Sequence, residues 1–321
     1  MSYYLGIDAG GTKTTCVLAD ETTVLARTTA GSIKIMRVSE QEAETNLTLL
    51  LKELTSQSGV GMDSVACTCI GLAGITVARV EQWTRSELQR KISGKILICG
   101  DEEIALDGAF SGEPGVLVMA GTGSNVIGRK MDGSVFHIGG WGPAVSDEGS
   151  GHWIGLQAVR AVLHAFDRGD VTLLQAAVLK QWQITTIPEM VAVANQVPGP
   201  DFSQLAPVVV ECANEGDAMA CAVLEDAGRD LGRFVTLALK KVQDSAPTPE
   251  ARVRLAFTGS VLGKIPQVRH ALVATVQRSL RNIEVRSEPV DSAMGALWRA
   301  RNSKELSLYA ASSPHPSASF I

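Results

Sequence analysis

Two short turns rich in glycine and hydroxyl residues, far apart in the chain, each interrupt an apolar run that is typical of a strand. The first, residues 8–14 (DAGGTKT), follows residues 3–7, and the second, residues 120–125 (AGTGSN), follows residues 115–119. Glycines at a hairpin tip permit a positive φ or a close backbone approach, and bare N–H groups there can face an anion. Either turn alone could be an ordinary β-hairpin, but the pair predicts two hairpins that hold one triphosphate from opposite sides.

The first turn carries side chains that suit phosphate and a divalent cation. Gly10 and Gly11 supply bare backbone, Thr12 supplies a hydroxyl and Lys13 a positive charge. Asp8 lies at a strand end, where a carboxylate can hold Mg²⁺ directly or through water, because Mg²⁺ prefers oxygen ligands and keeps several waters. The spacing fits neither the G-x-x-x-x-G-K-[ST] loop nor the G-x-G-x-x-G dinucleotide fingerprint, so the sequence supports neither of those nucleotide sites.

The bulk composition excludes several classes of protein. With 321 residues, 45% of them apolar, the chain can bury a large core and form two domains of ordinary size. A net charge of −5 without basic runs argues against nucleic acid or an anionic membrane surface as the main partner. The first residues lack the basic and apolar regions of a leader, and no apolar stretch approaches about 18 residues, so we expect a cytoplasmic protein.

The six cysteines indicate buried, reduced thiols, since they lie mostly in apolar surroundings without C-x-x-C spacing. We therefore expect neither disulfides nor zinc at Cys16, Cys67, Cys69, Cys99, Cys212 and Cys221. The metal that the motifs indicate is Mg²⁺ at Asp8.

The order of the expected elements indicates an α/β fold with two lobes. Residues 3–29 should form three strands, and the apolar spacing of residues 39–56 predicts a helix. Strands at 65–70 and 95–99 flank a helix at 77–91, an alternation that covers a sheet with helices.

The second half of the chain repeats this alternation of strands and helices, with a helical insert in its middle. We expect one lobe over residues 1–113 and the other over residues 114–304, with almost entirely helical patterning over 151–242. A last helix at 291–301 could return to the first lobe. The Ser/Pro-rich residues 305–321 are expected to be disordered.

Asp101 follows the strand expected at residues 95–99, and open α/β sheets place their chemistry beyond the carboxyl ends of the strands. This position predicts a general base, which contributes about 10²–10⁴ to the rate of a proton-transfer step. The alternative is a helix N-cap, because residues 102–106 (EEIAL) look helical and acids favour a first turn. Spacing alone favours the N-cap.

Residues 139–153 (GGWGPAVSDEGSGHW) combine flexible glycines with a tryptophan, two acids and hydroxyls. Sugar sites use this mixture, since acids accept hydrogen bonds from hydroxyls and an aromatic face packs on the C–H surface of the ring. The alternative is a glycine-rich turn in which Asp147 and Glu148 cap the following helix.

A third turn, residues 258–262 (TGSVL), follows an apolar run at 253–257. Its backbone could contact adenosine. The alternative is a plain turn between a strand and a helix.

Together these motifs resemble the actin, heat-shock chaperone and hexokinase ATPase superfamily. Within it the chain is similar to the bacterial glucosamine and N-acetylglucosamine kinase group, which also includes ATPases related to activators of acyl-CoA dehydratases. The resemblance covers residues 3–302, and the combination of motifs in this order is more specific than any one of them. The motifs are GIDAGGTKT (6–14), the Asp101 that ends ILICGD, AGTGSN (120–125), GGWG with SDEGSGHWIG (139–155), TGSV (258–261) and GALW (295–298).

The resemblance implies a two-lobed, actin-like (ribonuclease H-like) fold with duplicated mixed-sheet domains and ATP-Mg²⁺ in the cleft between the lobes. It also implies transfer of the γ-phosphate to a sugar hydroxyl, expected to be the 6-hydroxyl of N-acetylglucosamine or glucosamine. Asp8 would serve the metal and Asp101 would be the base. The residues implied to bind ATP are Gly10, Gly11, Thr12, Lys13, Gly121, Thr122, Gly123, Gly259 and Ser260, and those implied to line the amino-sugar pocket are Asn125, Gly140, Trp141 and Asp147. The resemblance leaves the question of a homodimer undecided.

One segment departs from the pattern of amino-sugar kinases. They carry an asparagine in the loop after the third strand, whereas residues 31–37 here read GSIKIMR. Lys34 and Arg37 could face an acidic substituent of the sugar, such as a lactyl carboxylate, or could simply be solvated. The identity of the sugar is therefore open.

Two other functions compete with a kinase. An activator of an acyl-CoA dehydratase needs interface cysteines for an iron–sulfur cluster, and residues 113–150 contain none. A regulator that binds nucleotide or sugar without catalysis is disfavoured by Asp101 beside two intact turns. No helix-turn-helix segment precedes residue 3, which argues against a DNA-binding repressor.

Overall fold

The computed structural model describes residues 1–75, 77–248 and 251–303, which pack into two compact units. The first unit holds Met1–Pro114, Met131–Ser134 and the described residues from Glu288 onward. The second unit holds Gly115–Lys130 and Val135–Ser287. The expected disordered tail, residues 305–321, lies outside the described residues.

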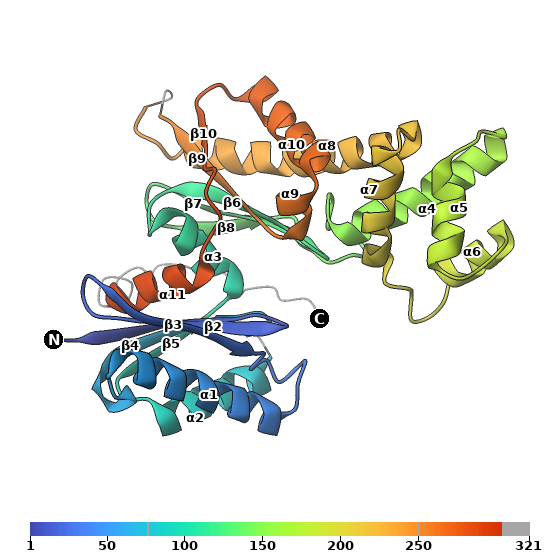
Figure 1. The fold of residues 1–321 in the computed structure, drawn as a ribbon. Helices are drawn as coiled ribbons and strands as arrows, with labels where there is room; N and C mark the ends of the chain where they lie inside the picture. The colour runs from blue at the N-terminus through green and yellow to red at the C-terminus, as the bar shows by residue number, and fades with distance from the viewer. Residues whose placement is uncertain (76, 249–250, 304–321) are drawn as a thin grey trace. The chain divides into compact units, whose positions relative to one another are not determined.

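The first unit is built on a five-stranded mixed sheet in the order β3-β2-β1-β4-β5 (Figure 1). Antiparallel pairing joins β1 to β2 and β2 to β3, whereas β4 pairs in parallel with β1 and β5 in parallel with β4. The strands are β1 (Tyr3–Ala9), β2 (Lys13–Ala19), β3 (Val24–Gly31), β4 (Val65–Leu72) and β5 (Lys95–Cys99).

Helices cover both faces of this sheet. The helices α1 (Glu40–Ser58) and α2 (Ala78–Lys91) share one apolar cluster with β1 and β2, and a short 3-10 helix, η1 (Met62–Ser64), precedes β4. On the other face, α3 (Asp101–Phe110) and α11 (Ser292–Arg301) pack against the sheet in two smaller clusters. A Cβ at Gly6 would lie 2.4 Å from the backbone nitrogen of Leu297, so glycine is what lets α11 lie directly on β1.

The second unit repeats the strand arrangement of the first. Its sheet has the order β10-β9-β6-β7-β8, in which β6, β7 and β8 pair antiparallel while β9 and β10 extend the sheet in parallel. The strands are β6 (Gly115–Ala120), β7 (Ser124–Arg129), β8 (Val135–Ile138), β9 (Val253–Thr258) and β10 (Ile283–Val285).

The long connection from β8 to β9 forms the helical insert of the second unit (Figure 1). The longest helix, α8, buries eleven residues and packs against α10, where Gly228 and Gly232 allow close contact. The elements of the insert are α4 (Gly151–Arg168), α5 (Leu173–Gln181), α6 (Ile187–Ala194), η2 (Phe202–Leu205), α7 (Ala206–Asn214) and α8 (Ala218–Gln243). Two further helices, α9 (Ser260–Lys264) and α10 (Pro266–Ser279), lie between β9 and β10.

The structure confirms the predicted α/β class, the two mixed sheets of like topology and the helical insert. The last helix, α11, lies in the first unit. Across the described ranges, no helix has both the length and the apolar character needed to span a bilayer. None of the six cysteines forms a disulfide, and all except Cys221 are buried.

Candidate active site

The first glycine turn joins β1 to β2, whose register pairs Ala9 with Thr14. The N–H groups of Gly11 and Thr12, both exposed, donate to no acceptor within the described residues. A Cβ at Gly10 would lie 2.8 Å from the carbonyl oxygen of Lys13, so close backbone approach explains this glycine. A positive φ, the other expected role of glycine in this turn, is wrong, because neither Gly10 nor Gly11 has one.

Two predicted site residues of the first unit, Asp8 and Asp101, both lie at the carboxyl edge of its sheet. Asp8 on β1 is in register with Gly71 on β4, which is in register with Cys99 on β5, and Asp101 follows two residues later. Burial and the negative charge of Asp101 raise the pKa of Asp8 to about 6. Asp291 adds to this rise, and the cation of Lys13 opposes it.

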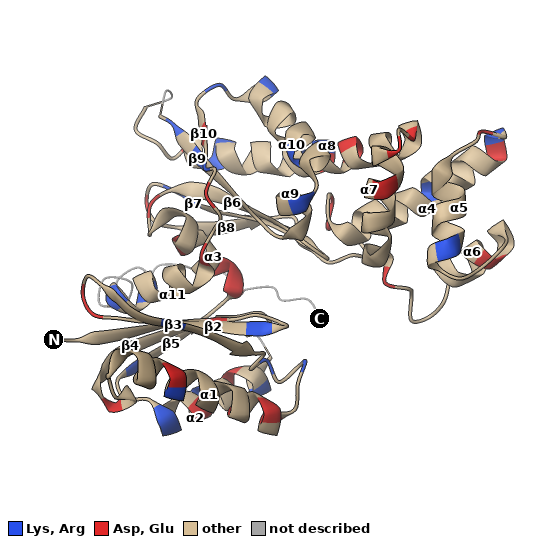
Figure 2. Cartoon of the chain, in the orientation of Figure 1, with Lys and Arg blue, Asp and Glu red and all other residues tan. Residues whose placement is uncertain are grey.

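Asp101 is the first residue of α3, and the N-cap is Gly100. The prediction that Asp101 itself is the N-cap, which spacing favoured, is therefore wrong. Its Oδ1 atom accepts a hydrogen bond from the N–H of Glu102 at 3.1 Å. Asp101, Glu102 and Glu103 together make the first turn of α3 acidic (Figure 2).

Glu102 is a further candidate for the site that the sequence motifs did not indicate. Burial, the charges of Asp101 and Glu103 and a hydrogen bond with Asp101 raise the pKa of Glu102 to about 7. A carboxyl with a pKa near neutral pH can exchange a proton during turnover. Its position directly after Asp101 was the available signal, but a run of acids in a first helical turn is also ordinary capping chemistry.

Arg27 on β3 and Asp291 before α11 were also missed, because they are far apart in the sequence. The guanidinium of Arg27 donates to both carboxylate oxygens of Asp291, at 2.6 Å and 3.1 Å. This pairing lowers the pKa of Asp291, which also accepts from the N–H of Met294 as the N-cap of α11. The two residues place opposite charges near Asp8.

The second glycine turn joins β6 to β7 and is held by the start of α4. The N–H of Gly121 donates to the carbonyl of Gly123 at 2.9 Å. Gly151 and His152, the first residues of α4, donate their N–H groups to the carbonyls of Gly121 and Thr122 at 2.7 Å and 3.1 Å. The N–H groups of Thr122 and Gly123 have no protein acceptor in the described part of the chain, and both residues are exposed.

The third turn lies beside the second. Thr258 on β9 is in register with Met119 on β6, and a Cβ at Gly121 would lie 3.8 Å from the Oγ of Ser260. Gly259 has a φ of 96°, and a Cβ there would lie 2.2 Å from the carbonyl oxygen of Ala120. The structure therefore brings together the two turns of the second unit that the resemblance assigned to nucleotide.

The sugar-loop residues 139–150 pack onto the β6–β7 turn. Ser124 donates its hydroxyl to the carbonyl of Glu148 at 2.9 Å. Asp147 is buried with a φ of 68°, and burial raises its pKa. A Cβ at Gly123 would lie 2.8 Å from the Oδ2 of Asp147. The N-cap of α4 is Ser150, so the alternative in which Asp147 and Glu148 cap this helix is wrong.

Two of the other predicted sugar contacts, Gly140 and Asn125, lie side by side in the second unit. A Cβ at Gly140, where φ is 70°, would lie 3.0 Å from the side chain of Asn125 on β7. The amide nitrogen of Asn125 lies 3.5 Å from the Nδ1 of His137. Trp141 is 56% exposed, which leaves part of its side chain open to solvent.

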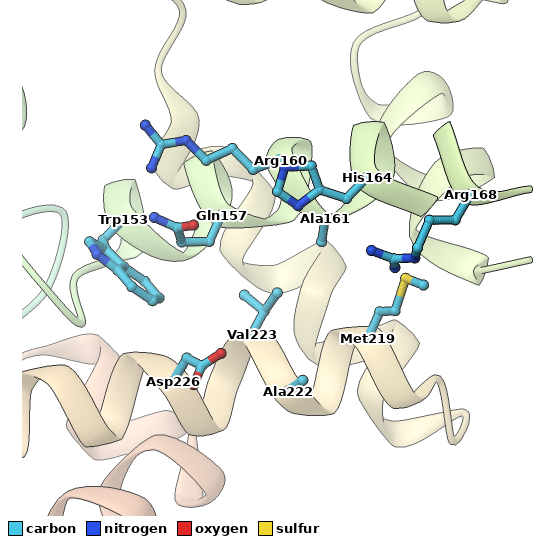
Figure 3. A pocket seen from close by; sticks show the side chains of 10 residues that line it. All are labelled: Trp153, Gln157, Arg160, Ala161, His164, Arg168, Met219, Ala222, Val223 and Asp226. Atoms are coloured by element: carbon cyan, nitrogen blue, oxygen red, sulfur yellow. The ribbon is translucent and has the colours of Figure 1, made fainter. Parts of the chain in front are cut away.

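A cavity of about 370 Å³ between α4 and α8 contains none of these predicted residues (Figure 3). It is lined by helix side chains, among them Trp153, Arg160, His164 and Asp226. Arg168 at one end pairs with Asp170 at 2.6 Å. The candidate active site therefore consists of the turns and carboxylates and does not include this cavity.

Comparison with known proteins decides the family. The model of the BadF/BadG/BcrA/BcrD ATPase family matches residues 5–300. The chain belongs to this family. The matched region includes all three glycine turns and Asp101.

Several relatives of this ATPase-family chain match it over nearly its full length. An N-acetylmuramic acid/N-acetylglucosamine kinase of Clostridium acetobutylicum is 29% identical over 94% of this chain and 99% of the relative. An N-acetyl-D-glucosamine kinase of Dictyostelium discoideum is 28% identical over 94% and 98%. The crystal structure of a candidate N-acetylglucosamine kinase from Chromobacterium violaceum is 27% identical, covers 92% of this chain and 98% of its own, and has a TM-score of 0.68.

Proposed function

We propose that the chain is an ATP-dependent amino-sugar kinase, which transfers the γ-phosphate of ATP to a hydroxyl of the sugar. The observation that carries this proposal is the pair of glycine turns, in each of which exposed N–H groups donate to no described residue. It is joined by carboxylates at the carboxyl edge of the first unit's sheet. The names of the relatives support it, since they include kinases of N-acetylglucosamine, N-acetylmuramic acid and glucosamine.

The turns are proposed to bind the nucleotide. The free N–H groups of Gly11, Thr12, Thr122 and Gly123 suit phosphate oxygens, and Lys13 adds a cation. In the second unit, the Oγ of Ser260 lies 3.8 Å from where a Cβ at Gly121 would be, so Ser260 suits the nucleoside side of a nucleotide bound at that turn. These groups act by position and charge, because a phosphoryl transfer leaves the protein little covalent chemistry.

Asp8 is proposed to hold Mg²⁺. Its carboxylate is partly buried beside the negative charges of Asp101 and Asp291, and a cation would relieve the repulsion that raises its pKa. No cluster of three metal-binding side chains occurs within the described ranges, which suits an ion that takes one or two carboxylates and completes its shell with water and phosphate. When bound, Mg²⁺ neutralises charge that develops on the transferred phosphoryl group.

Asp101 is proposed to accept the proton of the sugar hydroxyl. Asp101 is only partly buried at the start of α3, so its carboxylate can reach a ligand. Glu102, whose pKa is about 7, is positioned to share that proton through its hydrogen bond with Asp101. In the second unit, Asn125, Gly140, Trp141 and Asp147 are proposed to orient the amino sugar.

An ADP-release assay with Mg²⁺-ATP tests this function directly. The sugars are glucosamine, N-acetylglucosamine, N-acetylmannosamine, N-acetylmuramic acid and glucose, each compared with ATP alone. We expect one or more amino sugars to stimulate ADP release, and NMR of the product to place the phosphate on the 6-hydroxyl. If no sugar stimulates release above the ATP-only rate, the kinase proposal is wrong.

A further inference from the structure

The cavity between α4 and α8 is a concave feature of the second unit that the proposed function does not use. Its volume of about 370 Å³ suits a small molecule, since ligand sites in proteins commonly measure about 300–1,000 Å³. One face of each helix supplies the lining (Figure 3). Spacings of three and four positions place these residues together: Trp153, Gln157, Arg160 and His164 on α4, and Val223 and Asp226 on α8.

The lining of this cavity carries a cation that the described residues leave unpaired. Within the described ranges, the side chains of Arg160 and His164 form neither a hydrogen bond nor an ion pair. The carboxylate of Asp226 lines the same cavity but is paired with Arg229, which lies one turn further along α8. Asp226 therefore does not neutralise Arg160, and an anion from solution is the partner that would.

Three further lining side chains suit a ring that bears hydroxyl groups. The amide of Gln157 makes no hydrogen bond within the part of the chain that the structure describes, so it can donate to one hydroxyl and accept from another. The carboxylate of Asp226 has more lone pairs than its pairing with Arg229 uses. Trp153, one turn before Gln157, is partly buried against the apolar core and can pack its ring on the C–H surface of a sugar.

Helix α4 links the cavity to the second glycine turn. Gly151 and His152 donate their N–H groups to that turn, and Trp153 is the next residue of the helix. A ligand in the cavity would therefore contact the helix that holds the turn. The residues predicted to bind ATP, Mg²⁺ or the amino sugar are absent from the lining, so the cavity is separate from the candidate active site.

We propose that this cavity binds a phosphorylated sugar, with its phosphate on Arg160 and its ring on Trp153, at a site separate from the glycine turns. The guanidinium of Arg160 presents its N–H groups in a fork that matches two phosphate oxygens, and the imidazole of His164 can donate a further hydrogen bond. Gln157 and Asp226 then bind the hydroxyl groups of the ring. The inference goes beyond the kinase proposal and does not depend on it, because it concerns binding and not turnover.

The test measures the binding of glucosamine 6-phosphate to the full-length protein by calorimetry. A nonhydrolysable ATP analogue and Mg²⁺ are present throughout, so that the sugar phosphate does not compete for the glycine turns. Arg160→Gln is compared with Arg278→Gln, which removes an exposed arginine from α10 of the same unit. We expect Arg160→Gln to weaken binding roughly 10-fold and Arg278→Gln to change it less than about 2-fold. Absence of binding to the unaltered protein, or an unchanged affinity in Arg160→Gln, overturns the proposal.

Three other ligands, titrated under the same conditions, define the chemical class. Inorganic phosphate lacks the ring, N-acetylglucosamine lacks the phosphate, and adenosine 5′-monophosphate carries a base. We expect glucosamine 6-phosphate to bind roughly 10-fold tighter than inorganic phosphate or adenosine 5′-monophosphate, and the binding of N-acetylglucosamine to be independent of Arg160. Equal affinity for inorganic phosphate would mean an adventitious ion only, and tighter binding of adenosine 5′-monophosphate would mean a nucleotide site. Either result overturns the assignment of a sugar phosphate.

Hydrogen exchange on the unaltered protein keeps the test decisive if Arg160→Gln does not fold. Glucosamine 6-phosphate should slow the exchange of backbone amides along residues 157–164 of α4 and 222–226 of α8, with little effect on α10. Protection confined to the glycine turns would place the sugar phosphate in the candidate active site and overturn the inference. Neither measurement needs turnover, so an inactive protein in the ADP-release assay would remove the kinase proposal and leave this one standing.

Discussion

The guanidinium of Arg299 on α11 is paired with the carboxylate of Asp107 on α3, whose side chain is completely buried. The same guanidinium contacts Glu103 at 2.8 Å, and Glu103 in turn accepts from the N–H of Gly100 at 3.3 Å. Arg299 therefore fixes the start of α3, where Asp101 follows Gly100. A residue near the end of the described chain orients the proposed base.

Removing this cation should destabilise the first unit strongly. Arg299→Met removes the guanidinium that pairs with the buried carboxylate of Asp107, and breaking one side of a buried pair costs about 3–5 kcal/mol. Urea unfolding measures the loss. Arg85→Met is the control, because its i,i+4 pair with Glu81 is well exposed and should contribute less than about 1 kcal/mol. Equal losses in both variants would contradict the importance of burial.

Asp101→Asn should abolish most turnover and spare binding. The amide keeps the shape of the carboxylate but cannot take the proton, so we expect kcat to fall at least about 10²-fold with little change in the affinity for ATP. Steady-state kinetics and nucleotide titration measure the two effects. Glu102→Gln serves as the comparison and should lower kcat less. If Glu102→Gln proves the more damaging change, the base is Glu102.

Glu102 should also make the stability of the fold depend on pH. Its pKa in the fold is about 7, raised from 4.5 mainly by burial, so its ionisation opposes folding. The penalty is absent below pH 4.5, grows as the pH rises towards 7 and is complete above that value. Glu102→Gln should therefore raise the free energy of unfolding by about 3 kcal/mol near pH 8 and by almost nothing near pH 4.5. Denaturation curves at both pH values check this, and a gain that is the same at both would contradict it.

Gly295→Ala should destabilise the protein although alanine favours helices. A Cβ at Gly295 would lie 1.8 Å from the carbonyl oxygen of Ile104, so α11 would have to move away from α3. We expect a loss of several kcal/mol, larger than the roughly 1 kcal/mol that alanine gains in a helix. Gly263→Ala is the matched control, since a Cβ on that residue of α9 would meet nothing within 4 Å. Thermal unfolding should show a lower Tm for Gly295→Ala alone.

Periodicity and turn chemistry predicted most of the fold. The strand pattern around the first turn and the helical spacing of residues 39–56 depend only on residues close together in the sequence. The strands β1 and β2 and the helix α1 accordingly begin and end within two residues of the expected bounds. The repeated order of strands also predicted two sheets of like topology. The first unit, however, is completed by α11, and its packing on Gly6 depends on a contact between distant residues that no local pattern encodes.

The parts of the candidate site that lie in one continuous sequence motif were predictable. The parts that join residues distant in the sequence were not. The glycine turns and Asp147 lie in compact sequence motifs. The pair of Arg27 and Asp291 joins residues from opposite ends of the first unit's sequence, so spacing could not reveal it. Glu102 was visible in the sequence, but its burial, which gives it an unusual pKa, depends on tertiary packing.

The discontinuous make-up of the first unit has a consequence for synthesis on the ribosome. Its sheet emerges early, but α11 is translated only after the whole of the second unit. Until then, the apolar face of β2 that will pack against Ala293 and Leu297 has no cover from its own chain. A nascent chain of this protein therefore carries an incomplete first unit through most of its translation, a stage at which exposed apolar surface favours aggregation or the binding of a chaperone.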